Sequence, residues 1–267
     1  MIRLICIALL TLVTTTASQA QTRLSDLVRI TVLDGGQQAD GTHLAALRLT
    51  LKDGWKTYWR APGDAGIPPR FSWTGSRNLD GVDIVWPTPV VFDQGGYRSI
   101  GYVGELVLPL VLAPGKPGAP IRLSGEMELG VCEEVCIPAQ LSFAARLDPE
   151  AGRNPAISAA LAQGPFSPQE AGVQGATCAI RPSEDGLKIE TRIALPGGSG
   201  RETVIVEPGN PKIWASEMKA QRSGGTLVAK GELVHVDGKS FALNRSQIVI
   251  TVLTRGMAVE IHGCSPT

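Results

Sequence analysis

The stretch Gly130-Val-Cys-Glu-Glu-Val-Cys-Ile-Pro138 holds two cysteines, Cys132 and Cys136, separated by three residues. Residues 121–129 before it and residues 140–147 after it alternate apolar and polar side chains, which is the pattern of a half-buried β-strand. Two such strands with a short connection predict a β-hairpin that carries the cysteine pair at its tip. We interpret the rest of the chain as the scaffold that holds this pair.

The first 20 residues have the features of a secretory signal peptide. Arg3 supplies a positive charge, residues 4–13 are almost wholly apolar, and Ser18-Gln-Ala20 fits a small-x-small cleavage site. The apolar part, about 10 residues, is shorter than the roughly 20 that a transmembrane helix needs. We therefore expect cleavage near Ala20 and a periplasmic mature chain that does not span the membrane.

The charge balance argues against nucleic acid or an anionic membrane as a partner. The chain has 25 basic and 25 acidic residues, cleavage removes only Arg3 from them, and no run of Lys or Arg occurs. A surface without a basic surplus has no long-range attraction for polyanions.

Composition indicates an all-β protein. Among 267 residues there are 31 Gly and 19 Pro, and they break the chain into short alternating runs at the spacing of a sandwich. We predict two immunoglobulin-like β-sandwich domains, residues 21–149 and 176–267. The linker between them, residues 150–175, should contain a short helix that begins at Asn154-Pro155.

Three local predictions bear on the first domain. Residues 21–34 should form the opening strand, Asp34-Gly-Gly36 should be a turn, and residues 92–102 should be a loop. The large aromatic residues are expected to fill the sandwich core, and the other interpretation is a partner-binding aromatic surface. These aromatic residues are Trp55, Tyr58, Trp59, Trp73 and Trp86.

Cleavage at Ala20 leaves four cysteines, for which three pairings exist. Pairing Cys132 with Cys136 and Cys178 with Cys264 gives each domain its own bridge, whereas the crossed pairings would tie the domains together. In the chain-entropy model the long loop stabilises by about 4.6 kcal/mol and the short loop by about 2 kcal/mol. Cys178–Cys264 is therefore expected to be structural, and Cys132–Cys136 an exposed bridge of the reversible redox type.

Two other interpretations of Cys132 and Cys136 stay open. The bridge can be an ordinary hairpin staple, or the two thiolates can bind Cu(I), with Met127 as a further soft ligand. Thiol exchange itself requires no metal and no cofactor. The acidic neighbours Glu133 and Glu134 should disfavour thiolates, raise the thiol pKa and make the pair a reductant.

Three segments together resemble one family: Gly54-Trp-Lys-Thr-Tyr-Trp-Arg-Ala-Pro-Gly-Asp-Ala-Gly-Ile-Pro-Pro69, Tyr102-Val-Gly-Glu-Leu-Val-Leu-Pro-Leu110, and the cysteine stretch. They resemble the periplasmic N-terminal domain of DsbD-type disulfide reductases, and most of all the ScsB-like branch, which is associated with copper tolerance. The resemblance implies an immunoglobulin-like sandwich with Cys132 and Cys136 as the redox pair. Which of the two attacks first is left open by the sequence, and we favour Cys136.

The same resemblance implies partners and a cap. Such a domain receives electrons from a thioredoxin-like or membrane-embedded thiol carrier and passes them to oxidised periplasmic proteins. The membrane and thioredoxin-like domains of that family do not occur within these 267 residues, so we expect either that the electron donors are separate proteins or that the relay role has been lost. A cap loop with an aromatic residue shields the disulfide in the family, and here the matching candidates are Asp93 and Tyr97 in a Gly-Gly loop.

Two functions follow from the sequence. The first is a thiol–disulfide exchange protein, a component of a protein-disulfide reductase system that acts through Cys132 and Cys136. The second is a non-catalytic copper-handling or adaptor module, in which the pair is a staple or a Cu(I) ligand.

Overall fold

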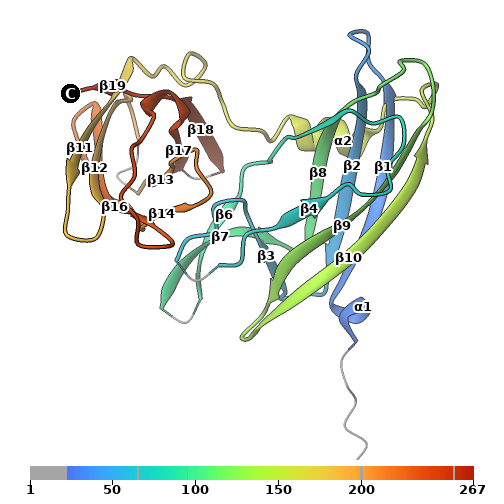
Figure 1. Cartoon of the computed structure of the whole chain (residues 1–267), viewed down its shortest axis with the longest axis horizontal. Coiled ribbons are helices and arrows are strands. Elements are labelled where there is room, and N and C mark those ends of the chain that lie inside the picture. Colours follow the sequence, from blue (N-terminus) through green and yellow to red (C-terminus); the bar gives the residue numbers. More distant parts are fainter. Residues whose placement is uncertain (1–22, 65, 95, 199–200, 255) are drawn as a thin grey trace, which may run out of the picture.

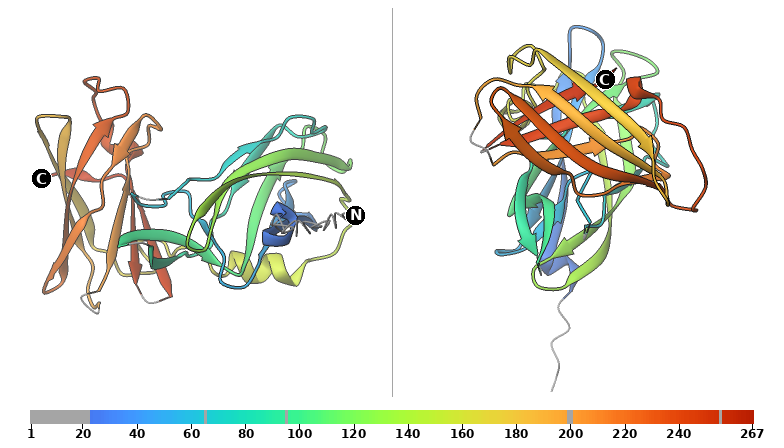
Figure 2. Two further views of the ribbon diagram at one scale, coloured as in Figure 1. Left: turned by 90° about the horizontal axis from the view of Figure 1, so that it is seen from below. Right: turned by 90° about the vertical axis from the view of Figure 1, so that its left-hand side faces the viewer.

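The structure, a computed structural model, describes residues 23–64, 66–94, 96–198, 201–254 and 256–267. The expected signal peptide lies outside the described residues. Strands dominate the chain, and they form two bodies of packed sheets that Figure 1 shows beside one another. The left view of Figure 2 shows the orange-to-red C-terminal body separately from the blue-to-green N-terminal body. The predicted all-β, immunoglobulin-like class is confirmed.

The N-terminal body, which we call the first sandwich, has two antiparallel sheets. One sheet has the strand order β1-β2-β8-β5 and the other β10-β9-β3-β7-β6, with β4 pairing to β9. The elements of the first sheet are β1 (Val28–Gln37), β2 (His43–Leu51), β5 (Gly81–Ile84) and β8 (Glu105–Ala113), and helix α1 (Leu24–Leu27) precedes them. The elements of the second sheet are β3 (Lys56–Tyr58), β4 (Arg70–Ser72), β6 (Val90–Gln94), β7 (Tyr97–Val103), β9 (Ile121–Cys132) and β10 (Cys136–Leu147).

The core of the first sandwich follows from the period-two pattern of its strands. Leu47 and Leu49 on β2 are opposite Leu108 and Leu106 on β8, and all four are buried. Burial of each such side chain contributes about 1.5–3 kcal/mol. This closed core leaves the second sheet with one covered face and one face on which the cysteine pair lies.

The C-terminal body, the second sandwich, also has two sheets, ordered β14-β16-β12-β11-β19 with β15 pairing to β16, and β13-β17-β18. The elements of the larger sheet are β11 (Gly175–Pro182), β12 (Leu187–Ala194), β14 (Ile213–Ala215), β15 (Lys219–Ser223), β16 (Thr226–His235) and β19 (Ser265–Pro266). The elements of the smaller sheet are β13 (Thr203–Glu207), β17 (Val249–Thr254) and β18 (Met257–His262), with the 3-10 helix η1 (Arg245–Gln247) before β17. A disulfide joins Cys178 on β11 to Cys264 just before β19, with an S–S distance of 2.02 Å. The predicted pairing of these cysteines is present.

Helix α2 (Pro155–Leu161) lies in the connection between the two bodies and contacts β8 and β2. The side chain of Asn154 caps it by accepting a hydrogen bond from the backbone N–H of Ala156, and Pro155 occupies the first turn. Ile157 and Ala160 are its buried residues. The short helix predicted at Asn154-Pro155 is therefore confirmed, and its apolar side ties the connection to the first sandwich.

The predicted opening strand is present but begins only at Val28, and the predicted turn at Asp34-Gly-Gly36 is wrong. Residues 24–27 are helical, and the strand that follows runs through Asp34-Gly-Gly36 to Gln37. The pairing of β1 with β2 shifts register between Asp34 and Gln37, and Gly36 has φ 73°. The Asp-Gly-Gly sequence thus forms a β-bulge. Bulges and turns both favour glycine, so the sequence alone does not distinguish them.

The prediction of a loop at residues 92–102 is also wrong. Strands β6 and β7 pair there as a hairpin whose turn includes Gly96 at φ 84°. The Oδ1 of Asp93 accepts a hydrogen bond from the N–H of Gly96. Few of the residues in this segment are strong strand formers, so its pairing comes from the neighbouring strand rather than from local preference.

Candidate redox site

The two cysteines of the central stretch lie at the tip of the β9–β10 hairpin, as predicted. Cys132 ends β9 and Cys136 begins β10, so they are opposite each other with their Cα atoms 4.2 Å apart. A disulfide joins them. Only residues 133–135 connect the strands, and this short connection holds the two sulfur atoms at one end of the sheet.

The two sulfur-bearing residues differ in exposure. Cys132 is 0% exposed, whereas Cys136 is partly exposed. The difference follows from strand order, because β9 lies between β10 and β3 while β10 is the edge strand of its sheet. The expectation of an exposed bridge is therefore correct only for Cys136, and Cys132 is covered by the neighbouring strand.

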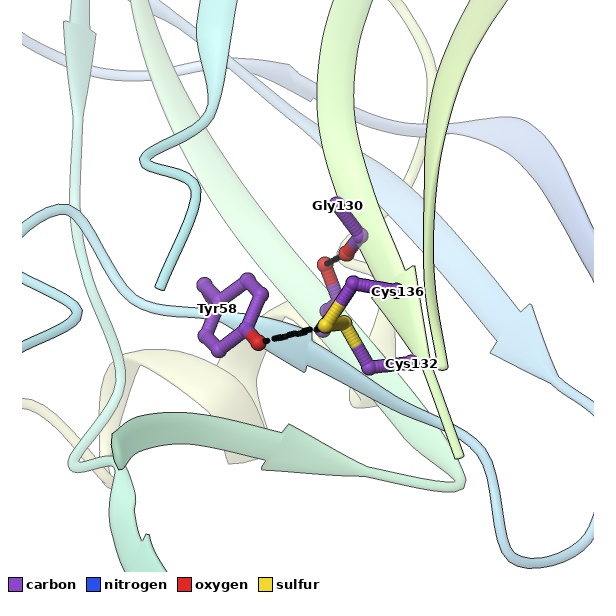
Figure 3. The surroundings of a disulfide bond; sticks show 5 residues. Tyr58, Gly130, Cys132 and Cys136 are labelled. Carbon is purple, nitrogen blue, oxygen red and sulfur yellow. Dashed lines mark hydrogen bonds between the residues drawn. A yellow bond between two sulfur atoms is a disulfide. The ribbon is translucent and has the colours of Figure 1, made fainter. Parts of the chain in front are cut away.

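Tyr58, at the end of β3, contacts both sulfur atoms. Its hydroxyl oxygen lies 3.0 Å from the Sγ of Cys136 and 3.1 Å from the Sγ of Cys132, and Figure 3 shows the ring pointing at the bridge. Sulfur atoms in a disulfide carry no hydrogen, so the hydroxyl is the donor. Tyr58 is 1% exposed, which makes it a buried polar group oriented toward the candidate reacting atoms.

Two glycines, Gly66 and Gly130, leave room for the Tyr58 ring. A Cβ atom placed on Gly130 would lie 3.0 Å from two ring carbons, and one placed on Gly66 would lie 2.9 Å from Cδ1. The carbonyl oxygen of Gly130 also accepts a hydrogen bond from the Oγ1 of Thr57 at 3.0 Å. The ring is thus enclosed between two backbone segments, and its hydroxyl has little freedom to leave the sulfur atoms.

Lys56 and Phe92 extend the site beyond Tyr58. Lys56 is opposite Cys132 in the pairing of β3 with β9, so their side chains leave the same face of the sheet. The Nζ of Lys56 lies 5.4 Å from the centroid of the Phe92 ring, which is 6.4 Å from the Tyr58 ring centroid. A cation therefore lies on the disulfide face, and a cation favours a thiolate.

The acidic residues proposed to tune the pair lie in the connection between the strands. Glu133 and Glu134 are both exposed. The Oε1 of Glu133 would lie 3.1 Å from a Cβ atom placed on Gly54, which locates this carboxylate over the turn before β3. Water screens exposed charges, so Lys56 is at least as well placed to influence Cys132, and tuning by the two acids stays a hypothesis.

The cap residues proposed from the sequence lie at the tip of the β6–β7 hairpin. Tyr97 is 62% exposed, and Asp93 is opposite Arg98 in the strand pairing. Phe92 is the residue of this hairpin whose ring neighbours Tyr58. The sequence did not single out Phe92, because its hairpin resembles a loop, or Lys56, because its place opposite Cys132 depends on strand order. Tyr58 was expected in the core. The alternation Val90, Phe92 along β6 was the signal available.

The proposed copper site with Met127 does not fit the strand geometry. Met127 and Cys132 both belong to β9, five positions apart, which is about 16 Å at the rise of an extended strand. An odd separation also puts the two side chains on opposite faces. Met127 therefore cannot share an ion with the cysteine pair.

Comparison with known proteins shows which family the first sandwich resembles. Residues 31–147 match the family model described as "Thiol:disulfide interchange protein DsbD, N-terminal". Residues 31–147 form a DsbD-type N-terminal domain. This DsbD-type domain contains the disulfide, Tyr58, Lys56 and Phe92, and it is a thiol–disulfide exchange module. None of the curated proteins matches the chain in sequence.

One solved structure has the fold of almost the whole chain. It is the N-terminal periplasmic domain of ScsB from Proteus mirabilis, with a TM-score of 0.69 and 21% sequence identity. The similarity covers 92% of this chain and 97% of the ScsB domain. The fold is therefore ScsB-like in both sandwiches, beyond the segment that the family model matches. No helix among the described residues has the length and hydropathy to cross a membrane.

Proposed function

We propose that this protein relays electron pairs in the periplasm through Cys132 and Cys136. The donor is a thioredoxin-like or membrane-embedded thiol carrier, and the acceptors are oxidised periplasmic proteins. The observation that carries this proposal is the asymmetric disulfide: Cys136 is partly exposed, Cys132 is buried, and a buried hydroxyl contacts the sulfur atoms of both.

Reduction of the pair begins at the exposed sulfur. A donor thiolate attacks the Sγ of Cys136, a bond forms between the two proteins, and the Cys132–Cys136 bond breaks with Cys132 leaving as a thiolate. The second thiol of the donor then attacks the donor sulfur of the mixed disulfide. This step forms the donor's own disulfide and releases Cys136 as a thiolate. A better stabilised leaving thiolate leaves faster, and the Tyr58 hydroxyl and the Lys56 cation are placed to stabilise it.

Delivery of the electron pair reverses these roles. The thiolate of Cys136 attacks the acceptor disulfide and expels one acceptor thiolate. Cys132 then attacks the Sγ of Cys136, which re-forms the intramolecular disulfide and releases the acceptor with both of its cysteines reduced. The short distance between the two cysteines favours this second step, because the resolving sulfur is already in contact range.

Loop length supports a redox role over a structural one. The cysteines of the Cys178–Cys264 bridge are 86 positions apart and those of Cys132–Cys136 are 4 positions apart. The chain-entropy model gives the first bridge about 4.6 kcal/mol of stabilisation and the second about 2 kcal/mol. The hairpin also has its own strand pairing, so it needs the short bridge less.

The test is direct transfer of electrons. The full mature chain is reduced at Cys132–Cys136, freed of reductant, and mixed with an oxidised thioredoxin-fold protein. Thiols on both proteins are then counted by alkylation and gel shift. We expect reoxidation of the pair in step with reduction of the acceptor. The matched control, Cys132→Ser with Cys136→Ser, retains Cys178–Cys264. Equal acceptor reduction by that control, or none by the wild type, would refute the proposal.

A further inference from the structure

Arg60 links the first sandwich to the second through two carboxylates. Its Nε lies 2.9 Å from the Oε1 of Glu207, and its Nη2 lies 2.9 Å from the Oε2 of the same residue. Nη2 also donates to Glu260. Glu207 ends β13 and Glu260 belongs to β18, so both partners lie on the smaller sheet of the second sandwich.

The chemistry of this cluster makes it a strong attachment. The side chains of Arg60, Glu207 and Glu260 are 22%, 25% and 19% exposed, so water screens them only in part. Burial lowers the pKa of Arg60, but hydrogen bonds and the charges of Glu207 and Glu260 outweigh it and raise the pKa. A bidentate arginine–carboxylate contact also fixes direction as well as distance.

Arg60 lies two residues after Tyr58, in the segment of residues 58–64, which we call the strap. The strap begins at Tyr58, whose hydroxyl contacts both sulfur atoms. A Cβ atom placed on Gly130 would meet the Tyr58 ring at 3.0 Å. The strap thus starts against the disulfide hairpin.

The middle of the strap is held from both sides. Trp59 is buried in the first core, and the guanidinium of Arg60 lies 4.4 Å from the centroid of its ring. The carbonyl of Pro62 accepts a hydrogen bond from the N–H of Ile100 at 3.0 Å. Arg60 is the strap residue that forms ion pairs with the second sandwich, so it is where that sandwich can act on the site.

The space around the ion cluster is hollow. A cavity of about 520 Å³ lies between the strap and the second sandwich, lined by Arg60, Pro62 and Arg98 on one side and by Glu207, Trp214 and Glu217 on the other. Arg98 and Glu217 form a second ion pair across it at 2.8 Å, with both side chains more than 40% exposed. The Arg60 cluster is therefore the attachment of the strap on the side of the second sandwich.

We propose that Arg60 is a positioning residue through which the second sandwich holds the strap, and with it Tyr58, against Cys132–Cys136. A partner thiol reaches the disulfide when the strap and Tyr58 shift, and the ion cluster sets how often this happens. That this control acts on a protein partner rests on the proposed function. That it limits access of any thiol to the disulfide does not.

The experiment measures the second-order rate constant for reduction of Cys132–Cys136 in the full mature chain by dithiothreitol. One variant is Arg60→Gln and the other combines Glu207→Gln with Glu260→Gln. Loosening the strap raises the reactive fraction, so both variants should react about three- to tenfold faster than the wild type. Arg60→Lys keeps the positive charge but loses the bidentate contact with Glu207, and its rate constant should lie between those of the wild type and Arg60→Gln.

The two variants change local charge in opposite directions, which separates the clamp from simple electrostatics. The attacking species is an anionic thiolate, so loss of a cation alone would slow it and loss of two anions alone would speed it. Acceleration of both variants supports the clamp. The control Arg98→Gln removes the other ion pair across the cavity, and its rate should stay within about twofold of the wild type.

Rates equal to wild type, or changes of opposite sign in the two variants, would overturn the proposal. Circular dichroism and the intact Cys178–Cys264 bridge verify folding, and if Arg60→Gln does not fold, Arg60→Lys decides, because it keeps the charge and electrostatics alone predicts no change in its rate. Failure of the electron-transfer test would leave these rates interpretable, so the two proposals fail separately.

Discussion

The hydroxyl of Tyr58 lies 3.0 Å from the Sγ of Cys136, although 78 positions separate the two residues. The tyrosine ends β3 and the cysteine begins β10, so their contact depends on the sheet order that places both beside β9. The glycines around the ring fix the donor in place. The hydrogen bond is therefore a product of the whole sheet rather than of the hairpin alone.

Replacing Tyr58 by Phe should slow the reactions of the reduced pair. A hydrogen bond to a charged acceptor is stronger than one to a neutral acceptor, so the hydroxyl favours thiolate over thiol. Its loss should raise the thiol pKa and reduce the rate of alkylation by iodoacetamide at pH 7 roughly three- to tenfold. The measurement is the pH dependence of that rate in the reduced protein. An unchanged profile would show that the hydroxyl contributes only to the oxidised form.

Single cysteine variants should differ in trapping a partner. Cys132→Ser retains the more exposed sulfur and removes the resolving one, so it should accumulate a mixed disulfide with an oxidised thioredoxin-fold protein. Cys136→Ser retains the buried sulfur and should give roughly tenfold less. Non-reducing gels of the two reactions give the yields. The reverse order would mean that Cys132 becomes accessible on reduction and attacks first.

Gly130→Ala should destabilise the first sandwich and disturb the site together. The new methyl group would press on the Tyr58 ring and on Ile67 at 3.0 Å, which predicts a loss of about 1–3 kcal/mol in the free energy of unfolding. The measurement is urea denaturation. Gly152→Ala is the control, because a Cβ atom there meets nothing within 4 Å, and a comparable loss in it would contradict the role assigned to Gly130.

Tyr102 should make the protein sensitive to alkaline pH. Burial raises the pKa of its hydroxyl far above the ordinary value, and the hydroxyl donates to the carbonyl of Pro87 at 2.8 Å. Above pH of about 10 the unfolded state loses this proton and the folded state keeps it, so stability falls by up to about 1.4 kcal/mol per pH unit. Below pH of about 10 both states are protonated and the effect vanishes.

Urea denaturation at pH 8.5 and pH 10.5 tests this expectation, with Tyr102→Phe as the comparison. The variant should lose about 1 kcal/mol at the lower pH, because its hydrogen bond is gone. It should also lose less stability than the wild type between the two values. Equal losses in both proteins would assign the alkaline sensitivity to other groups.

The sequence predicted the cysteine hairpin because every element of it is local. Alternation over residues 121–147 defines both strands, and a three-residue connection places Cys132 opposite Cys136 without help from the rest of the chain. The helix at Asn154-Pro155 was equally readable, since its cap and first turn are adjacent in sequence.

The environment of the disulfide could not be predicted in the same way. That Cys132 is buried and Cys136 is not depends on which strands flank β9, and strand order is a long-range property. Lys56 faces Cys132 for the same reason. Tyr58 was expected in the core because a buried core tyrosine and a buried tyrosine that contacts a disulfide have the same sequence pattern. Only the sheet order shows which of the two it is.

The central claim is that Cys132–Cys136 is a working redox pair rather than a staple. Its reduction potential, measured in glutathione or dithiothreitol buffers with Cys178–Cys264 intact, tests this most directly. We predict a value above about −300 mV, within the range of exchanging pairs. A value below about −300 mV would mark an inert structural bond and contradict the account.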